Sequence, residues 1–199
     1  MKQNINKTAV RLILLLLGFT WLIITAYPLC FMFITSLKSN MEFFSSIWSL
    51  PESFKLSNFR IVLESGFYRY FFNSLVVSVF SVIIIVVASA MASYVIARVK
   101  FRLSGVIFSL FLFGMMIPIH ITIIPIYKMT QSIGLYDTLI GLIGPYAAFN
   151  LPISIFILTG FMRDIPKEME EAAYMDGATT FQLFSKVIFP LSKPAISTV

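Results

Sequence analysis

Side chains that support catalysis or metal binding are scarce in this sequence of 199 residues. Cys30 and His120 are the only residues of their kinds, so neither an internal disulfide nor a zinc site of cysteine and histidine can form. None of the nine glycines is followed by lysine, which excludes a G-x-x-x-x-G-K phosphate loop. No G-x-S-x-G motif of a serine hydrolase occurs either. The residues therefore predict neither an enzyme nor a resident cofactor or metal.

Polar side chains inside long uncharged stretches are the candidates for lining a solute path. We single out five of them: Asn73, Ser74, Ser78, His120 and Asn150. His120 follows Pro118, and Asn150 precedes Pro152. Prolines that interrupt membrane helices often mark where side chains meet a watery cavity. The alternative is that these residues pack helices together, because small and polar side chains also do that in membranes.

Four uncharged stretches must position these residues. Of the whole chain, 58% is hydrophobic and only 12% is charged, about half the charged fraction of a soluble domain. The stretches cover residues 12–37, 71–97, 103–127 and 138–162. Each exceeds the roughly 20 residues that a helix needs to cross a bilayer. We therefore predict an all-α, polytopic membrane helix bundle with four complete spans.

The first stretch begins like a signal peptide but is too long and lacks an A-x-A cleavage site, which predicts an uncleaved span. Cys30 lies within it. The residues before Cys30 lack the small side chain that lipoprotein processing prefers, so we expect a buried thiol rather than a lipidation site.

Basic residues flank the stretches unequally and predict orientation. With a cytoplasmic N-terminus, ten Lys and Arg residues fall inside and five outside; the turn at 98–102 holds three of them and no acidic residue. Topology thus explains the net charge of +6, and no nucleic-acid partner is expected. We predict a multi-pass membrane protein, with an extracytoplasmic loop at 38–70 and a cytoplasmic loop at 163–193.

The cytoplasmic loop contains the patterns of two short helices. Asp164 is placed to cap the first, whose early turns hold three acidic residues near the positive end of the helix dipole: Glu168, Glu170 and Glu171. Gly177 is expected to end it in a left-handed conformation. Thr179 and Gln182 predict a capping box for the second helix. That helix is expected to end at Pro190 and to carry three apolar residues on one face: Phe181, Phe184 and Ile188.

The same segment resembles the EAA loop of ABC-importer permeases. That pattern is Glu-Ala-Ala, three residues, Gly, nine residues, Ile, one residue and Leu-Pro. This chain has Glu171-Ala172-Ala173 and Gly177 at the first positions, with Val187 and Phe189-Pro190 at the last. Valine replaces the isoleucine and phenylalanine the leucine. From about Phe71 to the end, further segments, including Ala92–Arg98, are similar to the carbohydrate-uptake branch of these permeases, of which the maltose permeases are the familiar example.

The resemblance implies a type I ABC-importer permease fold in the bacterial inner membrane, with residues 1–199 forming a single transmembrane permease domain. It also implies six spans, so the start of a fifth near Ala195 leads us to expect that the chain is truncated at its C-terminus. The loop would then be a coupling element that docks on an ATPase. The coupling residues implied are Glu171, Ala172, Ala173, Asp176, Gly177, Phe181 and Pro190.

The partners implied are a second permease subunit forming a heterodimer, two ATPase subunits that bind ATP and Mg, membrane lipid and an extracytoplasmic sugar-binding protein. The expected cargo is a sugar, in particular an oligosaccharide; a polyol or glycerol phosphate is the alternative. Other classes remain open: a secondary transporter, a membrane-bound enzyme or a scaffold. The loop could also lie on the membrane surface, but its five acidic residues outnumber its four basic ones, which favours docking on a protein.

Overall fold

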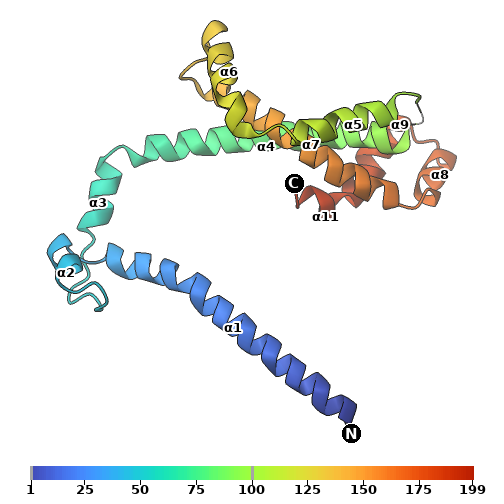
Figure 1. Cartoon of the computed structure of the whole chain (residues 1–199). Coiled ribbons are helices and arrows are strands. Elements are labelled where there is room, and N and C mark those ends of the chain that lie inside the picture. Colours follow the sequence, from blue (N-terminus) through green and yellow to red (C-terminus); the bar gives the residue numbers. More distant parts are fainter. Residues whose placement is uncertain (1, 100) are drawn as a thin grey trace. The chain divides into compact units, whose positions relative to one another are not determined.

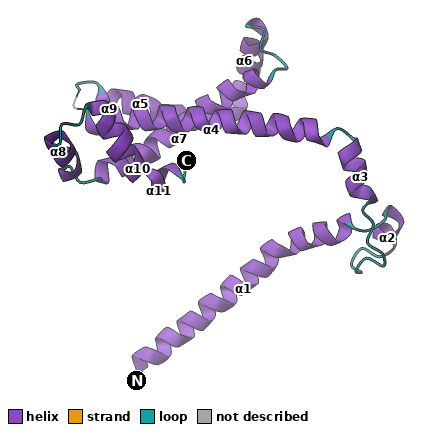
Figure 2. Ribbon diagram, turned by 180° about the vertical axis from the view of Figure 1, so that it is seen from behind, coloured by secondary structure: helices purple, strands orange, loops and turns teal. Residues whose placement is uncertain are grey.

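The computed structural model describes the backbone of residues 2–99 and 101–199, and side chains from Lys7 onward. Lys2 and Lys100, which contributed to the predicted orientation, lie outside the described side chains. The described residues form only helices and connecting turns (Figure 2). They divide into two compact units, residues 1–70 and 71–199. The interpretation of the chain as one domain stays a prediction.

The helices in chain order are as follows (Figure 1). The first unit contains α1 (Lys2–Ser36), α2 (Asn40–Ser45) and α3 (Ser57–Glu64), and α4 (Phe67–Arg98) continues from it into the second unit. The second unit adds α5 (Ser104–Met115), α6 (Ile119–Ser132), α7 (Leu139–Asp164) and α8 (Glu168–Met175). It ends with α9 (Thr180–Leu183), the π-helical turn η1 (Phe184–Ile188), α10 (Phe189–Leu191) and α11 (Lys193–Ile196).

Three of the predicted spans are continuous helices: α1 from Lys7, α4 and α7 are each long and apolar enough to cross a membrane. The third predicted span is instead divided into α5 and α6, which bend by 97° at a short break. Pro118 precedes α6 there with an extended backbone. Proline disfavours helical geometry in the residue before it, which explains why the helix stops at this point.

In the first unit, α1 presents its apolar side chains outward over its described length, with large hydrophobic residues from Val10 to Phe33 about half to two-thirds exposed. Cys30 is also exposed, so the prediction of a thiol buried by the chain itself is wrong. The reason is that α1 packs against few residues of its own unit. In a bilayer, lipid or another protein covers such a surface.

A buried lysine organises the segment after α1. Lys38 is only 1% exposed, and its Nζ donates to the carbonyl oxygens of Ser46 at 2.9 Å and Ile47 at 3.3 Å. It also donates to Ser49 Oγ at 3.1 Å. Three donors therefore satisfy three oxygens of the loop that follows α2. Lys38, one of the five basic residues that the charge pattern places outside the membrane, thus points into this loop and closes it.

Aromatic packing brings the same loop back onto α1. The ring of Trp48 lies 6.0 Å from that of Tyr27 and 5.6 Å from that of Phe31, measured between centroids. Tyr27 and Phe31 are one turn apart on α1, so both face the same side. The segment predicted as an extracytoplasmic loop is therefore a small folded structure.

In the second unit, the last turns of α4 and α7 share a core with the residues after α8. Ala90 and Tyr94 of α4 pack with Leu158 and Met162 of α7. Figures 1 and 2 both show α5, α7 and the C-terminal turns beside the second half of α4. Small hydroxyl residues are buried in the two helices: Ser81, Ser89, Ser93, Ser154 and Thr159. Small side chains of this kind let membrane helices approach closely.

One hydrogen bond and one close apolar contact define how α7 meets its neighbours. Ser93 Oγ of α4 donates to the carbonyl oxygen of Ile155 at 3.2 Å. On the α5 side, a Cβ added to Gly114 would lie 3.3 Å from Cγ of Pro152, so the two helices approach closely there. The phenyl rings of Phe108 and Phe156 lie 6.4 Å apart across the same interface.

Replacing Lys38 by methionine is expected to loosen the outer loop. The change keeps the length of the side chain but leaves two carbonyl oxygens without their donor, which costs about 1–3 kcal/mol for buried groups. Hydrogen exchange followed by mass spectrometry should show faster exchange over residues 39–55. Lys55→Met is the matched control, because the side chain of Lys55 is exposed. Equal exchange in Lys38→Met and the wild-type protein would contradict this account.

Candidate functional site

The first helix of the predicted coupling loop is α8. Glu168, Glu170 and Glu171 lie in its first turn, as predicted. The prediction that Asp164 caps it is wrong. Asp164 is the last residue of α7, and α8 starts after Lys167, which makes no side-chain capping bond. Helix α7 continues two residues beyond its uncharged stretch, through Arg163 and Asp164, because a membrane helix can carry charged residues once it reaches the interface.

The turn between α8 and α9 forms as predicted. Gly177 has a φ of +79°, and its amide donates to the carbonyl oxygen of Tyr174. Thr179 caps α9: its Oγ1 accepts from the amide of Gln182 at 3.3 Å, and Gln182 Oε1 accepts from the amide of Thr179 at 2.9 Å. Both features depend only on neighbouring residues, so the sequence carries the full signal for them.

The π-helical turn η1 decides which residues after α9 point inward. Leu183 and Ile188 are both fully buried although they are five residues apart. In a π-helix, residues five apart are hydrogen-bonded neighbours on one face, whereas an α-helix would place them on different sides. Phe181 therefore does not share the buried face with Ile188 as predicted; it is 73% exposed.

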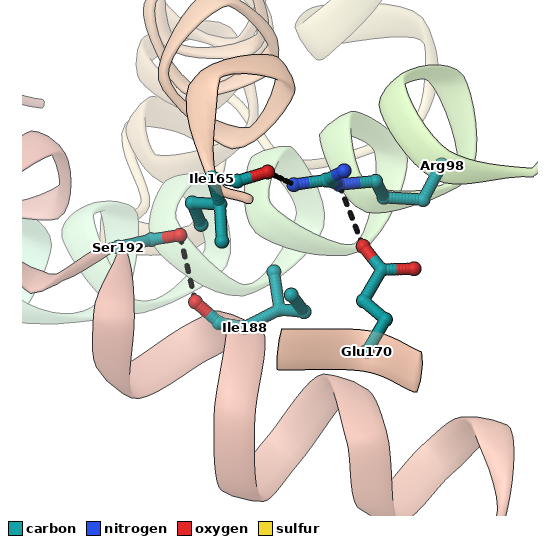
Figure 3. Close-up of polar contacts among 5 residues, drawn as sticks. All are labelled: Arg98, Ile165, Glu170, Ile188 and Ser192. Atoms are coloured by element: carbon teal, nitrogen blue, oxygen red, sulfur yellow. Dashed lines mark hydrogen bonds and ion pairs between the residues drawn. The ribbon is translucent and has the colours of Figure 1, made fainter. Parts of the chain in front are cut away.

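The predicted helix end at Pro190 lies one residue before the observed one. The helical run from α9 through η1 ends with α10 at Leu191, and a turn at Ser192 precedes α11. The helical path then continues through α11, with a change of direction at Ser192. Ser192 is fully buried, and its Oγ donates to the carbonyl oxygen of Ile188 at 2.8 Å (Figure 3).

Most of the predicted coupling residues are exposed, and we call the exposed residues from Glu171 to Phe181 the loop face. It includes Glu171, Ala172 and Asp176 on or directly after α8, together with Phe181 of α9. Met175, which sequence reasoning did not single out, is 88% exposed beside them. Ala173, by contrast, is half-buried against the core. The loop face thus combines carboxylates with bare apolar side chains, a composition suited to contact with another protein.

Behind the loop face, an arginine fastens α8 to the ends of two longer helices (Figure 3). Arg98 is the last residue of α4, and its Nε lies 2.8 Å from Glu170 Oε1 of α8. The two form an ion pair, although the Nε hydrogen does not point directly at the oxygen. Nη2 of the same guanidinium donates to the carbonyl oxygen of Ile165, directly after α7, at 2.5 Å. Sequence reasoning used Arg98 only as an orientation signal, because a pairing over about 70 positions leaves no local pattern.

The five predicted path residues are spread over three helices. Asn73, Ser74 and Ser78 lie in the first half of α4, where Asn73 is half-buried and the two serines are exposed. His120 is exposed at the start of α6. Asn150 is exposed on α7, and its Nδ2 donates to the carbonyl oxygen of Tyr146 at 2.8 Å. Their assignment to a solute path stays a prediction.

Known proteins resemble this chain over most of its length. The family described as "Binding-protein-dependent transport system inner membrane component" matches residues 84–199, more than half of the chain. A protein of Caldicellulosiruptor sp. (strain Rt8B.4) that is named as an ABC transporter permease is 48% identical over 180 residues, which are 90% of this chain and 66% of that protein. The diacetylchitobiose uptake system permease protein of Streptomyces coelicolor is 34% identical over 90% of this chain and 60% of its own length.

A solved structure has the same fold. The crystal structure of a bacterial ABC transporter involved in the import of the acidic polysaccharide alginate matches 98% of this chain and 68% of its own chain, with a TM-score of 0.83 and 26% identity. The chain spans about two thirds, or somewhat less, of the length of the relatives it matches. The family match over more than half of the chain, together with these relatives, shows that the chain belongs to the family of binding-protein-dependent transport system inner membrane components.

Proposed function

We propose that the chain acts as a membrane-spanning permease subunit of an ATP-driven importer. In this role it moves a sugar, delivered by an extracytoplasmic binding protein, through the membrane into the cytoplasm. The observation that carries the proposal is the loop face: Glu171, Met175 and Phe181 are exposed together on a short helical segment that is anchored to α4 and α7. A surface that is exposed and yet firmly held suits the transfer of force from another subunit.

The energy comes from partner subunits in this proposal. Two ATPase subunits bind ATP and Mg, dock on the loop faces of two permease subunits and drive their rearrangement; this chain supplies no nucleotide site. The second permease subunit is a different chain, so the pair is a heterodimer. The acidic residues of the loop face predict a basic or mixed surface on the ATPase. The N-terminus lies in the cytoplasm, on the same side of the membrane as the loop face.

The cargo that we propose is an oligosaccharide. Two proteins similar to this chain support this class: one is named for the uptake of diacetylchitobiose, and another belongs to a transporter involved in the import of alginate. Diacetylchitobiose and alginate are both built of linked sugar units. A polyol or glycerol phosphate is the alternative cargo. We propose that Asn73, Ser74, Ser78, His120 and Asn150 line its path, since their amide, hydroxyl and imidazole groups can bond to sugar hydroxyls.

Uptake should require ATP and the complete set of partners. Proteoliposomes holding this chain, its second permease and the ATPase are expected to accumulate labelled oligosaccharide only with internal ATP and external binding protein. Glycerol phosphate and a polyol serve as comparison cargoes in the same assay. Accumulation driven by a proton or sodium gradient without ATP would overturn the proposal in favour of a secondary transporter.

Gly177→Val is expected to weaken ATPase docking. No atom lies within 4 Å of the added Cβ, so the cost is in the backbone, where a β-branched residue at φ +79° loses about 1–3 kcal/mol. This corresponds to a roughly 5- to 150-fold weaker association if the strain is relieved by displacing α9. Co-purification of the ATPase at equal membrane abundance measures the effect. Gly177→Asn is the control, because asparagine tolerates this conformation and should retain most of the association. Wild-type association of Gly177→Val would contradict the prediction.

Glu171→Ala should weaken association less. Glu171 is exposed, and one exposed ion pair contributes little, so the expected loss is about fivefold at most. The loss should shrink as salt is raised, since screening weakens the same contact in the wild-type complex. The same co-purification, repeated at low and high salt, tests this. A loss that does not depend on salt would show that Glu171 makes no electrostatic contact with the ATPase.

A further inference from the structure

Two neighbouring glutamates of α8 have opposite surroundings. Glu171 is exposed on the loop face, whereas the side chain of Glu170 is only 16% exposed and faces Arg98. The Arg98 side chain is 5% exposed. Glu171, which belongs to the loop face, and Glu170, which contacts the end of α4, are therefore adjacent in sequence.

The contact at Arg98 joins three helices through one rigid group. A guanidinium is planar and presents several donors in fixed directions, so it can hold two partners at once. Here Nε meets Glu170 of α8 while Nη2 meets the carbonyl oxygen of Ile165 after α7, and the side chain itself starts at the end of α4. A lysine at this position has one point of charge and cannot reproduce both contacts in the same geometry.

Other contacts hold α8 less firmly. No residue of α8 is fully buried, and Ala173 is only half-buried against the core. Tyr94 of α4 also interacts with Tyr174 and Glu170, at the same junction. The deeply buried apolar residues Leu183 and Ile188 belong to α9 and η1 instead. The ion pair is therefore the charged attachment between α8 and the membrane-spanning helices.

We propose that Arg98 and Glu170 are positioning residues that make α4 follow α8 when an ATPase moves the loop face. The inference rests on the proposed function. Pulling a shielded carboxylate away from its only described cation is costly, so a displacement of α8 carries Arg98, and with it the end of α4, rather than breaking the pair. Arg98 and Glu170 thus transmit movement, while Glu171 and Phe181 receive it.

The test separates transmission from stability by removing both charges. Arg98→Gln or Glu170→Gln alone leaves a shielded charge unpaired and is expected to lower the abundance of the chain. Arg98→Gln combined with Glu170→Gln leaves no unpaired charge and should be restored toward wild-type abundance. Glu168→Gln and Arg102→Gln are matched controls, since both side chains are exposed near the same helix ends.

Movement is read from a fluorescent label attached at one of two positions in the assembled importer. With Cys30 replaced by serine, one cysteine is placed at Met169 of α8, which is exposed outside the loop face, or at Val79 of α4, which is also exposed. When a non-hydrolysable ATP analogue is added to the importer with Arg98 and Glu170 intact, both labels should respond. In the double Gln variant the label at 169 should still respond, whereas the response at 79 should fall roughly fivefold or more. Arg98→Lys with Glu170 intact should retain more of the response at 79 than the double Gln variant does.

A response at 79 that equals wild type in the double variant, with the label at 169 also responding, would overturn the proposed link. A failure of the proposed function has another signature: the label at 169 would not respond to the nucleotide even in the chain with Arg98 and Glu170 intact and its ATPase present.

Discussion

The packing of the last turns of α4 and α7 against the residues after α8 is the contact on which the second unit depends. Tyr94, Met162, Leu183 and Ile188 come from three separate parts of the chain and are all buried in one cluster. Neither membrane-spanning helix has a charged residue in this cluster to fix its direction. Two polar contacts supply that direction. Within the helices, Ser93 donates to the carbonyl oxygen of Ile155, and at their ends Arg98 donates to the carbonyl oxygen of Ile165.

Within this short segment, the side chains that anchor it to the core differ from those that are exposed for contact with a partner. Between Glu168 and Leu191, the fully buried Leu183 and Ile188 anchor the segment, and strongly exposed residues form the loop face. Phe181 is 73% exposed and Leu183 is fully buried, only two residues apart. A surface built in this way can be contacted by a partner without losing its own attachment, because the two sets of contacts use different side chains. The first unit uses a different device, a buried lysine that closes a loop through backbone oxygens.

Sequence patterns predicted the features that depend on nearby residues or on bulk composition. The three continuous spans follow from apolar length alone, and the Gly177 turn and the Thr179 cap follow from residues within a few positions. The errors have different causes. Asp164 was misplaced because a helix end at the membrane interface is not marked by charge, and Phe181 because the pattern was read with an α-helical period. Lys38 and Arg98 were missed as structural residues, since their partners are selected by the folded chain.

The extra residue accommodated in η1 changes which residues near the end of the chain share a buried face. A one-residue insertion in an α-helix rotates everything after it by about 100°, which would turn a buried side chain toward the outside. A π-helical turn absorbs that rotation locally, so Leu183 before it, Ile188 at its end, and Ser192 and Ala195 after it all remain buried. The apolar positions on either side of η1 are consequently out of phase with one another. Any amphipathic pattern drawn through residues 180–196 with a single period therefore describes two surfaces as if they were one.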